Sequence, residues 1–349
     1  MKAVFSPSIP WLNTLNNHQN GIGPDPSHLF KLLESQGIEV KIIDPTRGFK
    51  NPFDGKDTLL QSIDPWRALS TAFGERDANV VVSVFEGAAI SLSAIRWTMQ
   101  PRTSLVMWDI GLTDWRLRNK LINFALPKID ELMVLGVNQV DYIKKTYTTC
   151  PSISVIGHYI DADFYQQVSL SASGHILSVG DDVGRDFPTL NEATRGLGRK
   201  VVIKASRHPP GDTHGEVQVI KNRISFLELR DLYAQAAVVV VPTFVTPNAC
   251  GVSSILEASA MGRPLVVSDN PGIRDFVIPN ETCLVVPPGD ASALREAIHF
   301  LLDNPVVSKR LGDGARHFVE KNCTCDVFAD RFGNALRRVV ETKERSSRH

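Results

Sequence analysis

The stretch Ala236–Asp290 reads AAVVVVPTFVTPNACGVSSILEASAMGRPLVVSDNPGIRDFVIPNETCLVVPPGD and decides the fold class. An apolar run, Val238–Val241, ends at a proline, and a turn-rich loop then leads into a helical segment, Val252–Met261, that Gly262 closes. A second apolar run, Leu265–Val267, follows. Runs that are apolar on both faces are typical of parallel strands covered by helices. The sequence therefore predicts strand, loop, helix and strand of an α/β protein.

One acid, Glu257, lies in the middle of this apolar helical segment. The preceding loop, Asn248–Gly251, lies at the carboxyl end of a strand, where open parallel sheets bind their ligands. Its small residues let backbone N–H groups approach an anion, and the helix dipole favours negative charge there. A carboxylate one to two turns further along can accept hydrogen bonds from a ribose. These features favour a nucleotide diphosphate, while the alternative places Glu257 on a solvated helix face. The candidate nucleotide-binding residues here are Asn248, Cys250, Gly251, Val252, Ser253 and Glu257.

Length and composition narrow the class of protein. The 349 residues suit two domains of ordinary size. Lys plus Arg and Asp plus Glu both number 38, so no global charge attracts nucleic acid. No apolar run approaches the roughly 18 residues of a spanning helix, and the N-terminus lacks the apolar region of a signal peptide. Five scattered cysteines indicate a reducing compartment, and we expect a cytoplasmic protein in which Cys323 and Cys325 are ordinary thiols.

Strand and helix patterns alternate through the first half of the chain, which predicts a doubly wound parallel sheet with right-handed crossovers. The loop from Asn13 to Pro26 contains Gly21 and Gly23, but it lacks the third glycine of a nicotinamide fingerprint. The expected strands are 2–6, 40–43, 80–85, 104–108, 131–135 and 152–156, and the expected helices include 87–99, 115–124 and 137–145.

The second half restarts the alternation with a strand at 175–179 and a Gly-rich loop that contains Arg185. An arginine in such a loop suits bidentate contact with phosphate. The alternative is a surface salt bridge with Asp182 or Asp186. Further strands are expected at 201–203 and 217–220, followed by helices at 227–235, 293–302, 307–321 and 326–344.

The run 236–290 resembles the donor-site segment of retaining glycosyltransferases of the GT-B fold, family four in particular. The matching residues are Gly251, Leu256–Gly262, Pro264–Val267, Pro271–Ile273 and Val286–Asp290. The resemblance implies two Rossmann-like doubly wound domains that face a cleft. It places an acceptor-binding domain at 1–160, completed by a C-terminal helix at 325–349, then a linker at 161–174 and a nucleotide-sugar-binding domain at 175–324.

Two family residues are replaced in this sequence. The first of the family's two acids falls on Asn248, and Asp186 stands where a lysine usually follows Arg185. The missing charge could come from Lys204 or Arg207. The amide in place of the acid leaves the identity of the sugar open.

The resemblance implies roles for further residues. Arg185 would hold the diphosphate, Ile224 would pack against the base, and Gly21 and Gly23 would lie near the donor phosphates. Asp109, at a strand end, could bind a hydroxyl of the transferred sugar or deprotonate the acceptor, or it could cap the following turn. Glu86 lies at another strand end, where the alternative is a helix cap.

Two other motifs have alternative explanations. Asp161-Ala162-Asp163 imitates a metal-binding D-x-D, but it lies in a connecting stretch where the family has a similar aspartate and no metal. The basic helical segment Trp115–Leu121 could lie on an anionic membrane, although a solvated helix face is the commoner case.

We therefore expect a retaining, metal-independent glycosyltransferase without a cofactor. It would move a sugar from a nucleotide-sugar donor to a hydroxyl of a glycan, lipid or small molecule. Catalytic roles would belong to Asp109 and Arg185. The alternatives are a nucleotide-sugar epimerase on the same fold and a non-catalytic binding or scaffold protein.

Overall fold

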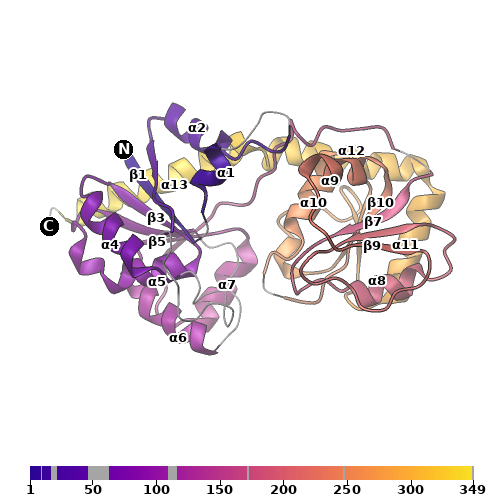
Figure 1. Cartoon of the computed structure of the whole chain (residues 1–349), viewed down its shortest axis with the longest axis horizontal. Helices are drawn as coiled ribbons and strands as arrows, with labels where there is room; N and C mark the ends of the chain where they lie inside the picture. The colour runs from indigo at the N-terminus through magenta and orange to yellow at the C-terminus, as the bar shows by residue number, and fades with distance from the viewer. Residues whose placement is uncertain are drawn as a thin grey trace. The chain divides into compact units, whose positions relative to one another are not determined.

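The computed structural model describes residues 1–8, 10–16, 22–45, 63–108, 116–170, 173–246 and 248–347. The chain divides into two compact units (Figure 1). The first comprises residues 1–18, 26–157 and 328–349, and the second comprises residues 19–25 and 158–327. Among the described residues, no helix combines the length and apolar character needed to cross a membrane.

The first unit contains a six-stranded parallel sheet in the order β2-β1-β3-β4-β5-β6. Its central strands are buried along their whole length, as the continuous apolar runs predict. The strands are β1 (Lys2–Pro7), β2 (Glu39–Ile42), β3 (Val80–Val84), β4 (Ser104–Trp108), β5 (Glu131–Val134) and β6 (Ser152–Val155). The helices are α1 (Leu12–Asn16), α2 (His28–Ser35), α4 (Pro65–Gly74), α5 (Glu86–Ala94), α6 (Arg116–Ala125), α7 (Val137–Thr146) and α13 (Cys325–Ser346), with short 3₁₀ turns η1 (Arg96–Thr98) and η2 (Leu126–Lys128).

Two expectations for this unit were wrong in detail. The helix expected over 87–99 ends at Ala94, because Ile95 and Thr98 make tighter three-residue hydrogen bonds that form η1. The loop expected over 13–26 begins with α1. Asp44 stabilises the start of that helix by accepting hydrogen bonds from the N–H groups of Trp11 at 2.8 Å and Leu12 at 3.0 Å. This cap comes from a residue that is distant in the sequence, so the local pattern could not reveal it.

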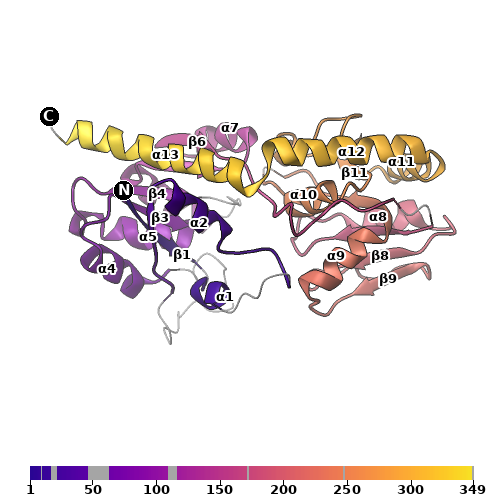
Figure 2. The ribbon, with the colours of Figure 1, turned by 90° about the horizontal axis from the view of Figure 1, so that it is seen from above.

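The C-terminal helix α13 completes the first unit by covering one face of its sheet (Figure 2). Its Phe332 stacks on Phe5 at 6.0 Å between ring centroids and meets Trp108 edge-on at 5.0 Å. Gly333 permits close approach, since a Cβ there would lie 2.5 Å from Gln36 Oε1. Further along the helix, Lys343 Nζ pairs with Asp130 Oδ1 at 2.6 Å.

The second unit contains a six-stranded parallel sheet in the order β12-β11-β10-β7-β8-β9. From β7 the chain first builds one half of the sheet and then returns to build the other half from β10, so a topological switch point lies between β7 and β10. The strands are β7 (His175–Val179), β8 (Val201–Lys204), β9 (Val217–Ile220), β10 (Ala236–Val241), β11 (Leu265–Ser268) and β12 (Leu284–Val286). The helices are α8 (Phe187–Thr194), α9 (Phe226–Ala234), α10 (Val252–Ala260), α11 (Ala291–Asp303) and α12 (Pro305–Asn322), with the 3₁₀ turn η3 (Pro271–Ile273).

The connecting stretch after β6 is fastened to the second unit. Asp161 organises it, because its side chain accepts hydrogen bonds from the N–H groups of Asp163 at 3.1 Å, Phe164 at 2.9 Å and Asp25 at 3.0 Å. The carboxylate of the D-x-D look-alike is thus engaged by backbone amides of a turn. The third of these bonds also joins the segment around Asp25 to the second unit.

Candidate functional site

Two loops meet at the switch point of the second unit, one after β7 and one after β10. The N–H of Asp186 donates to Pro242 O at 3.0 Å, and the N–H of Phe244 donates to Gly184 O at 2.9 Å. Gly180 makes room for the side chain between the loops, since a Cβ at this position would lie 2.1 Å from Arg185 Nε. The backbone therefore fixes Arg185 at the point where parallel sheets of this topology bind ligands.

The Arg185 guanidinium is buried, with 6% of the residue exposed. Its Nε donates to Asp182 Oδ2 at 3.0 Å, and its Nη2 donates to Ser254 Oγ on α10 at 2.9 Å. Among the described residues, no acceptor reaches Nη1. The ion pair with Asp182 that the alternative expected is present, but the guanidinium in it is buried and keeps one nitrogen without an acceptor in the part of the chain that the structure describes. A buried donor without an acceptor costs about 1–3 kcal/mol, which an anionic ligand oxygen would recover.

Gly251 lies beside the unpartnered nitrogen and begins α10. Its φ of 87° is in the left-handed region, and a Cβ here would lie 2.6 Å from Val241 Cγ1 and 3.3 Å from Arg185 Nη1. No side chain caps the first turn of α10. The Val252 N–H donates to Ala249 O at 3.3 Å, and the next N–H groups of this turn are available to an anion beside the arginine.

Gly251→Ala is expected to lower the free energy of unfolding by at least about 1–2 kcal/mol, because the left-handed conformation alone costs this much for an L-residue. It should also weaken nucleoside diphosphate binding, since the methyl group would displace the Arg185 guanidinium. Chemical denaturation and calorimetry measure the two effects. Gly289→Ala is the matched control, because Gly289 has a φ of 76° with open space around its missing Cβ. It should lose stability but not affinity, and equal losses of affinity would contradict the assignment.

Cys250 interacts with the same cluster in a way that the sequence did not predict. Its thiol donates to Asp182 Oδ1, while the other oxygen of Asp182 accepts from Arg185. Burial raises the pKa of Cys250, so the thiol stays protonated and acts as a donor. A Cβ at Gly184 would lie 2.6 Å from Cys250 Sγ. The signal in the sequence was the pair of glycines around Asp182, which leave room for both side chains.

The remaining residues of the α10 loop lie close by. Val252 is buried, and Ser253 is exposed with its Oγ 3.4 Å from His158 Nε2. The Asn248 N–H donates to Thr246 Oγ1 at 3.2 Å, and Asn248 O accepts from the Cys250 N–H at 2.8 Å. The structure thus brings Asn248, Cys250, Gly251, Val252 and Ser253 together at the N-terminus of α10.

Glu257 lies one turn beyond Ser253 and is partly buried. Tyr233 donates its hydroxyl to Glu257 Oε2 at 2.7 Å, and Tyr165 donates to Oε1 at 3.3 Å. Burial raises the pKa of Glu257 to about 7, although the two tyrosine hydroxyls and the positive charge of Arg185 act in the opposite direction. The solvated helix face is therefore excluded. Sequence reasoning missed both tyrosines, which lie 24 and 92 residues away.

A cavity of about 480 Å³ lies next to this cluster and contains two more of the expected residues, Lys204 and Ile224. Lys204 is buried at the end of β8 and its Nζ donates to Ser206 Oγ. Gly23 packs just outside, where a Cβ would lie 2.7 Å from Cδ2 of the lining residue Phe226. The full lining comprises Ile22, Val179, Gly180, Asp181, Lys204, Ser206, Arg223, Ile224, Ser225, Phe226 and Leu229.

Comparisons with known proteins agree with this architecture. Residues 195–304 match the model of the family Glycosyl transferases group 1. O-antigen chain mannosyltransferase C of Escherichia coli is 30% identical over 106 residues, which cover 30% of this chain and 28% of that protein. D-inositol 3-phosphate glycosyltransferase of Streptomyces bingchenggensis is 31% identical over 110 residues, which cover 30% of this chain and 24% of that protein. The alignments thus span about a quarter of each relative.

Solved structures match over nearly the whole chain. Sucrose-phosphate synthase from Thermosynechococcus elongatus has a TM-score of 0.78 at 17% identity, covering 98% of this chain and 100% of that chain. HepE from Anabaena in complex with UDP-glucose has a TM-score of 0.71 at 12% identity, covering 97% and 100%. The chain has the GT-B fold of glycosyltransferases.

Within this GT-B fold, some expected residues lie outside the described part of the chain. These are Gly21, the candidate catalytic Asp109, and Trp115 with the side chains of residues 116–119 at the start of α6. Glu86 is described, and it is buried in the first turn of α5. The candidate nucleotide-sugar-binding residues that the structure describes therefore all belong to the second unit.

Proposed function

We propose that this chain is a glycosyltransferase that binds a nucleotide-sugar donor in its second unit and transfers the sugar to an acceptor hydroxyl. The observation that carries the proposal is the unpartnered, buried Nη1 of Arg185 beside the uncapped start of α10. This arrangement suits a diphosphate, because a guanidinium and helix N–H groups converge on one point. In HepE, a protein of the same fold, a UDP-sugar is bound.

The donor would extend from this point in two directions. The base would enter the cavity that Ile224 lines, and the ribose would donate hydrogen bonds to Glu257. The transferred sugar would lie near Asn248, where an amide replaces the acid of the resembled family. Gly23 supports this arrangement from outside the cavity, because it allows the chain to pack on Phe226.

The transfer would proceed with retention of configuration, an assignment that rests on the resemblance of residues 236–290 to retaining enzymes. Negative charge on the departing diphosphate would be stabilised by Arg185, by Lys204 and by the first N–H groups of α10. This is the task that a metal performs in other enzymes, so the chain would need none. Asp109 remains the candidate for contact with the sugar or the acceptor.

Transfer is expected to survive exhaustive chelation, because protein cations would meet the charge of the leaving group. The measurement is the rate of nucleotide release after treatment with EDTA and removal of the chelator. Asp163→Ala, which removes one carboxylate of the D-x-D look-alike, should be equally active. Loss of turnover that Mn²⁺ or Mg²⁺ restores would refute the metal-free assignment.

Incubation with a panel of UDP-, ADP-, GDP- and dTDP-sugars tests the class of reaction. Slow release of the nucleoside diphosphate supports a transferase, since water can replace a missing acceptor. An isomerised donor would indicate the alternative epimerase, and tight binding without any turnover would indicate a scaffold protein. The acceptor, whether a glycan, a lipid or a small molecule, is then found by acceleration of the same release.

The proposal includes a cytoplasmic location, which the five free cysteines support.

A further inference from the structure

The helices α4, α5 and α6 form a layer of the first unit, in which α5 packs against both others. This layer exposes large aromatic side chains. Trp97 is 83% exposed, Trp66 60%, Phe73 50% and Phe124 47%. No other Phe, Tyr or Trp is exposed among the described residues of this unit. Exposed apolar side chains that gather on one surface mark interaction sites more often than single ones do.

Three of these residues lie where the helices end. Phe73 is in the last turn of α4, Trp97 follows α5, and Phe124 is in the last turn of α6. Each helix leads into a strand of a parallel sheet, so all three ends lie at the amino edge of that sheet. Trp66 is seven residues before Phe73 and therefore on the same face of α4.

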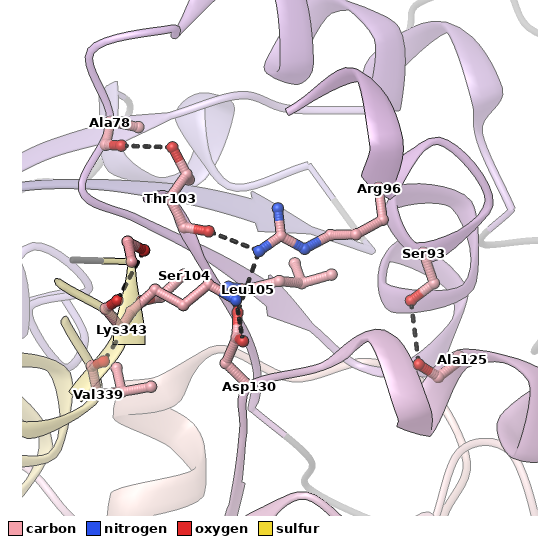
Figure 3. A network of polar contacts seen from close by, with 11 residues as sticks. Ala78, Ser93, Arg96, Thr103, Ser104, Leu105, Ala125, Asp130, Val339 and Lys343 are labelled. Atoms are coloured by element: carbon pink, nitrogen blue, oxygen red, sulfur yellow. Dashed lines mark hydrogen bonds and ion pairs between the residues drawn. The ribbon is translucent and has the colours of Figure 1, made fainter. Parts of the chain in front are cut away.

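A network of hydrogen bonds holds these ends together (Figure 3). Thr103 Oγ1 donates to Ala78 O at 2.9 Å, which joins the loops that follow α4 and η1. Arg96 Nη2 donates to Thr103 O at 2.7 Å and pairs with Asp130 at 3.2 Å, which adds the loop that follows α6. Ser93 Oγ also reaches Ala125 O at 3.5 Å. The segments that carry the exposed aromatic side chains are therefore held together by these hydrogen bonds.

The ends of these helices and the loops that follow them carry positive charges that no nearby acid in the described part of the unit neutralises. Arg76 lies over the Phe73 ring at 5.7 Å, and Lys128 Nζ lies over the Phe124 ring at 3.3 Å. Arg102 is exposed between η1 and β4. Among the described residues, none of these three cations has an ion pair. The acids of the same loops are all paired, namely Glu75 with Lys2 and Lys41, Asp77 with Lys2, and Asp130 with Arg96 and Lys343.

We propose that this aromatic–basic surface, formed by Phe73, Arg76, Trp97, Arg102, Phe124 and Lys128, docks onto an anionic lipid bilayer. Tryptophan prefers the boundary between headgroups and hydrocarbon, phenylalanine rings bury at the same depth, and exposed cations are attracted to anionic headgroups. The chain has no net charge, so the attraction is local to this edge. A symmetric contact between two copies would place the same cations against each other, which disfavours self-association.

Sedimentation with vesicles tests the proposal. The protein should bind vesicles of phosphatidylcholine and phosphatidylglycerol, should bind vesicles of pure phosphatidylcholine much less, and should be released by salt. Each cation near an anionic surface contributes roughly a fivefold factor in affinity. The triple variant Arg76→Gln/Arg102→Gln/Lys128→Gln should therefore bind roughly a hundredfold more weakly. Trp97→Ala should also weaken binding to vesicles. The effect of this substitution should depend less on salt than the effect of the triple charge variant.

The second unit supplies a matched control. Phe300 on α11 is 47% exposed, as Phe124 is, and Lys321 is an exposed cation of α12. The variant Phe300→Ala/Lys321→Gln should bind vesicles with the affinity of the unchanged protein. The variant Phe124→Ala/Lys128→Gln should bind them more weakly. Thermal melting and nucleotide binding should be unchanged in all these variants, which verifies that they fold.

Three outcomes would overturn the proposal. The protein could fail to bind anionic vesicles. It could also bind them equally well when the cations and rings of the aromatic–basic surface are substituted. It could also bind single-stranded oligonucleotides in preference to vesicles through the same cations, which would assign the surface to nucleic acid.

Discussion

Arg185→Ala is expected to abolish most of the affinity for a nucleoside diphosphate while leaving the affinity for the bare nucleoside nearly unchanged. Loss of a charge-assisted hydrogen bond costs roughly 1.5–3 kcal/mol, which corresponds to a factor of ten to a hundred or more in the dissociation constant. Turnover should fall further, by roughly two to three orders of magnitude, because charge on the diphosphate grows as the sugar departs. Calorimetry and single-turnover measurements give the two quantities.

Arg185→Lys is the sharper variant, because it keeps the charge but cannot satisfy Asp182, Ser254 and a phosphate oxygen at once. It should retain part of the diphosphate affinity and less of the turnover. Asp182→Asn removes the negative neighbour and leaves the guanidinium, so diphosphate affinity should be retained or increased. Normal turnover in a folded Arg185→Ala protein would remove this residue from the site.

Glu257→Gln is expected to weaken nucleotide binding and, at alkaline pH, to stabilise the fold. In the resting protein burial raises the pKa of Glu257 to about 7, above its ordinary value of 4.5. The folded state therefore holds this proton more tightly than the unfolded state does. The contribution of Glu257 to the free energy of unfolding is greatest below about pH 4.5. It falls as the pH rises to about 7 and is constant above pH 7. The cost of ionising the buried acid is about 3 kcal/mol at pH 8. Glutamine avoids it, so the variant should unfold at a higher temperature than the original at pH 8 but not at pH 5.

The affinity for nucleotide should show the opposite trend with pH. A ribose hydroxyl donates best to the ionised carboxylate, so the binding advantage of the original protein over the Glu257→Gln variant should appear as pH rises through about 7. Taking the ratio of the two affinities cancels the ionisation of the phosphate itself. Tyr233→Phe removes one donor to Glu257 and should shift the midpoint to higher pH. A ratio that is constant from pH 5 to 8 would contradict contact between the carboxylate and the ligand.

The central strands of both sheets could be predicted because their residues are buried on both faces, which leaves continuous apolar runs such as Val80–Val84 and Ala236–Val241. The positions of Arg185 and Gly251 could also be predicted, since strand, glycine loop and helix follow each other within a few residues. The GT-B fold was predicted correctly from the resemblance of one segment.

Contacts between distant residues could not be predicted in this way. Tyr165 and Tyr233 carry no local mark of their bonds to Glu257, and Cys250 gives no sign of its bond to Asp182. The cap that Asp44 provides for α1 and the bond from Asp25 to Asp161 also span more than thirty residues. These interactions depend on how the elements pack, which a periodic pattern does not encode.

The C-terminal helix has a consequence for how the chain is made. The main part of the first unit ends at residue 157, yet that unit also includes residues 328–349, which are made after residues 158–327 of the second unit. A ribosome adds roughly 5–20 residues per second, so the sheet of the first unit waits on the order of ten to thirty seconds for α13. During that interval Phe5 and Trp108 lack the rings of Phe328 and Phe332 that later cover them. The second unit contains no such late segment and can finish folding first, which makes the first unit the part of the nascent chain with most need of a chaperone.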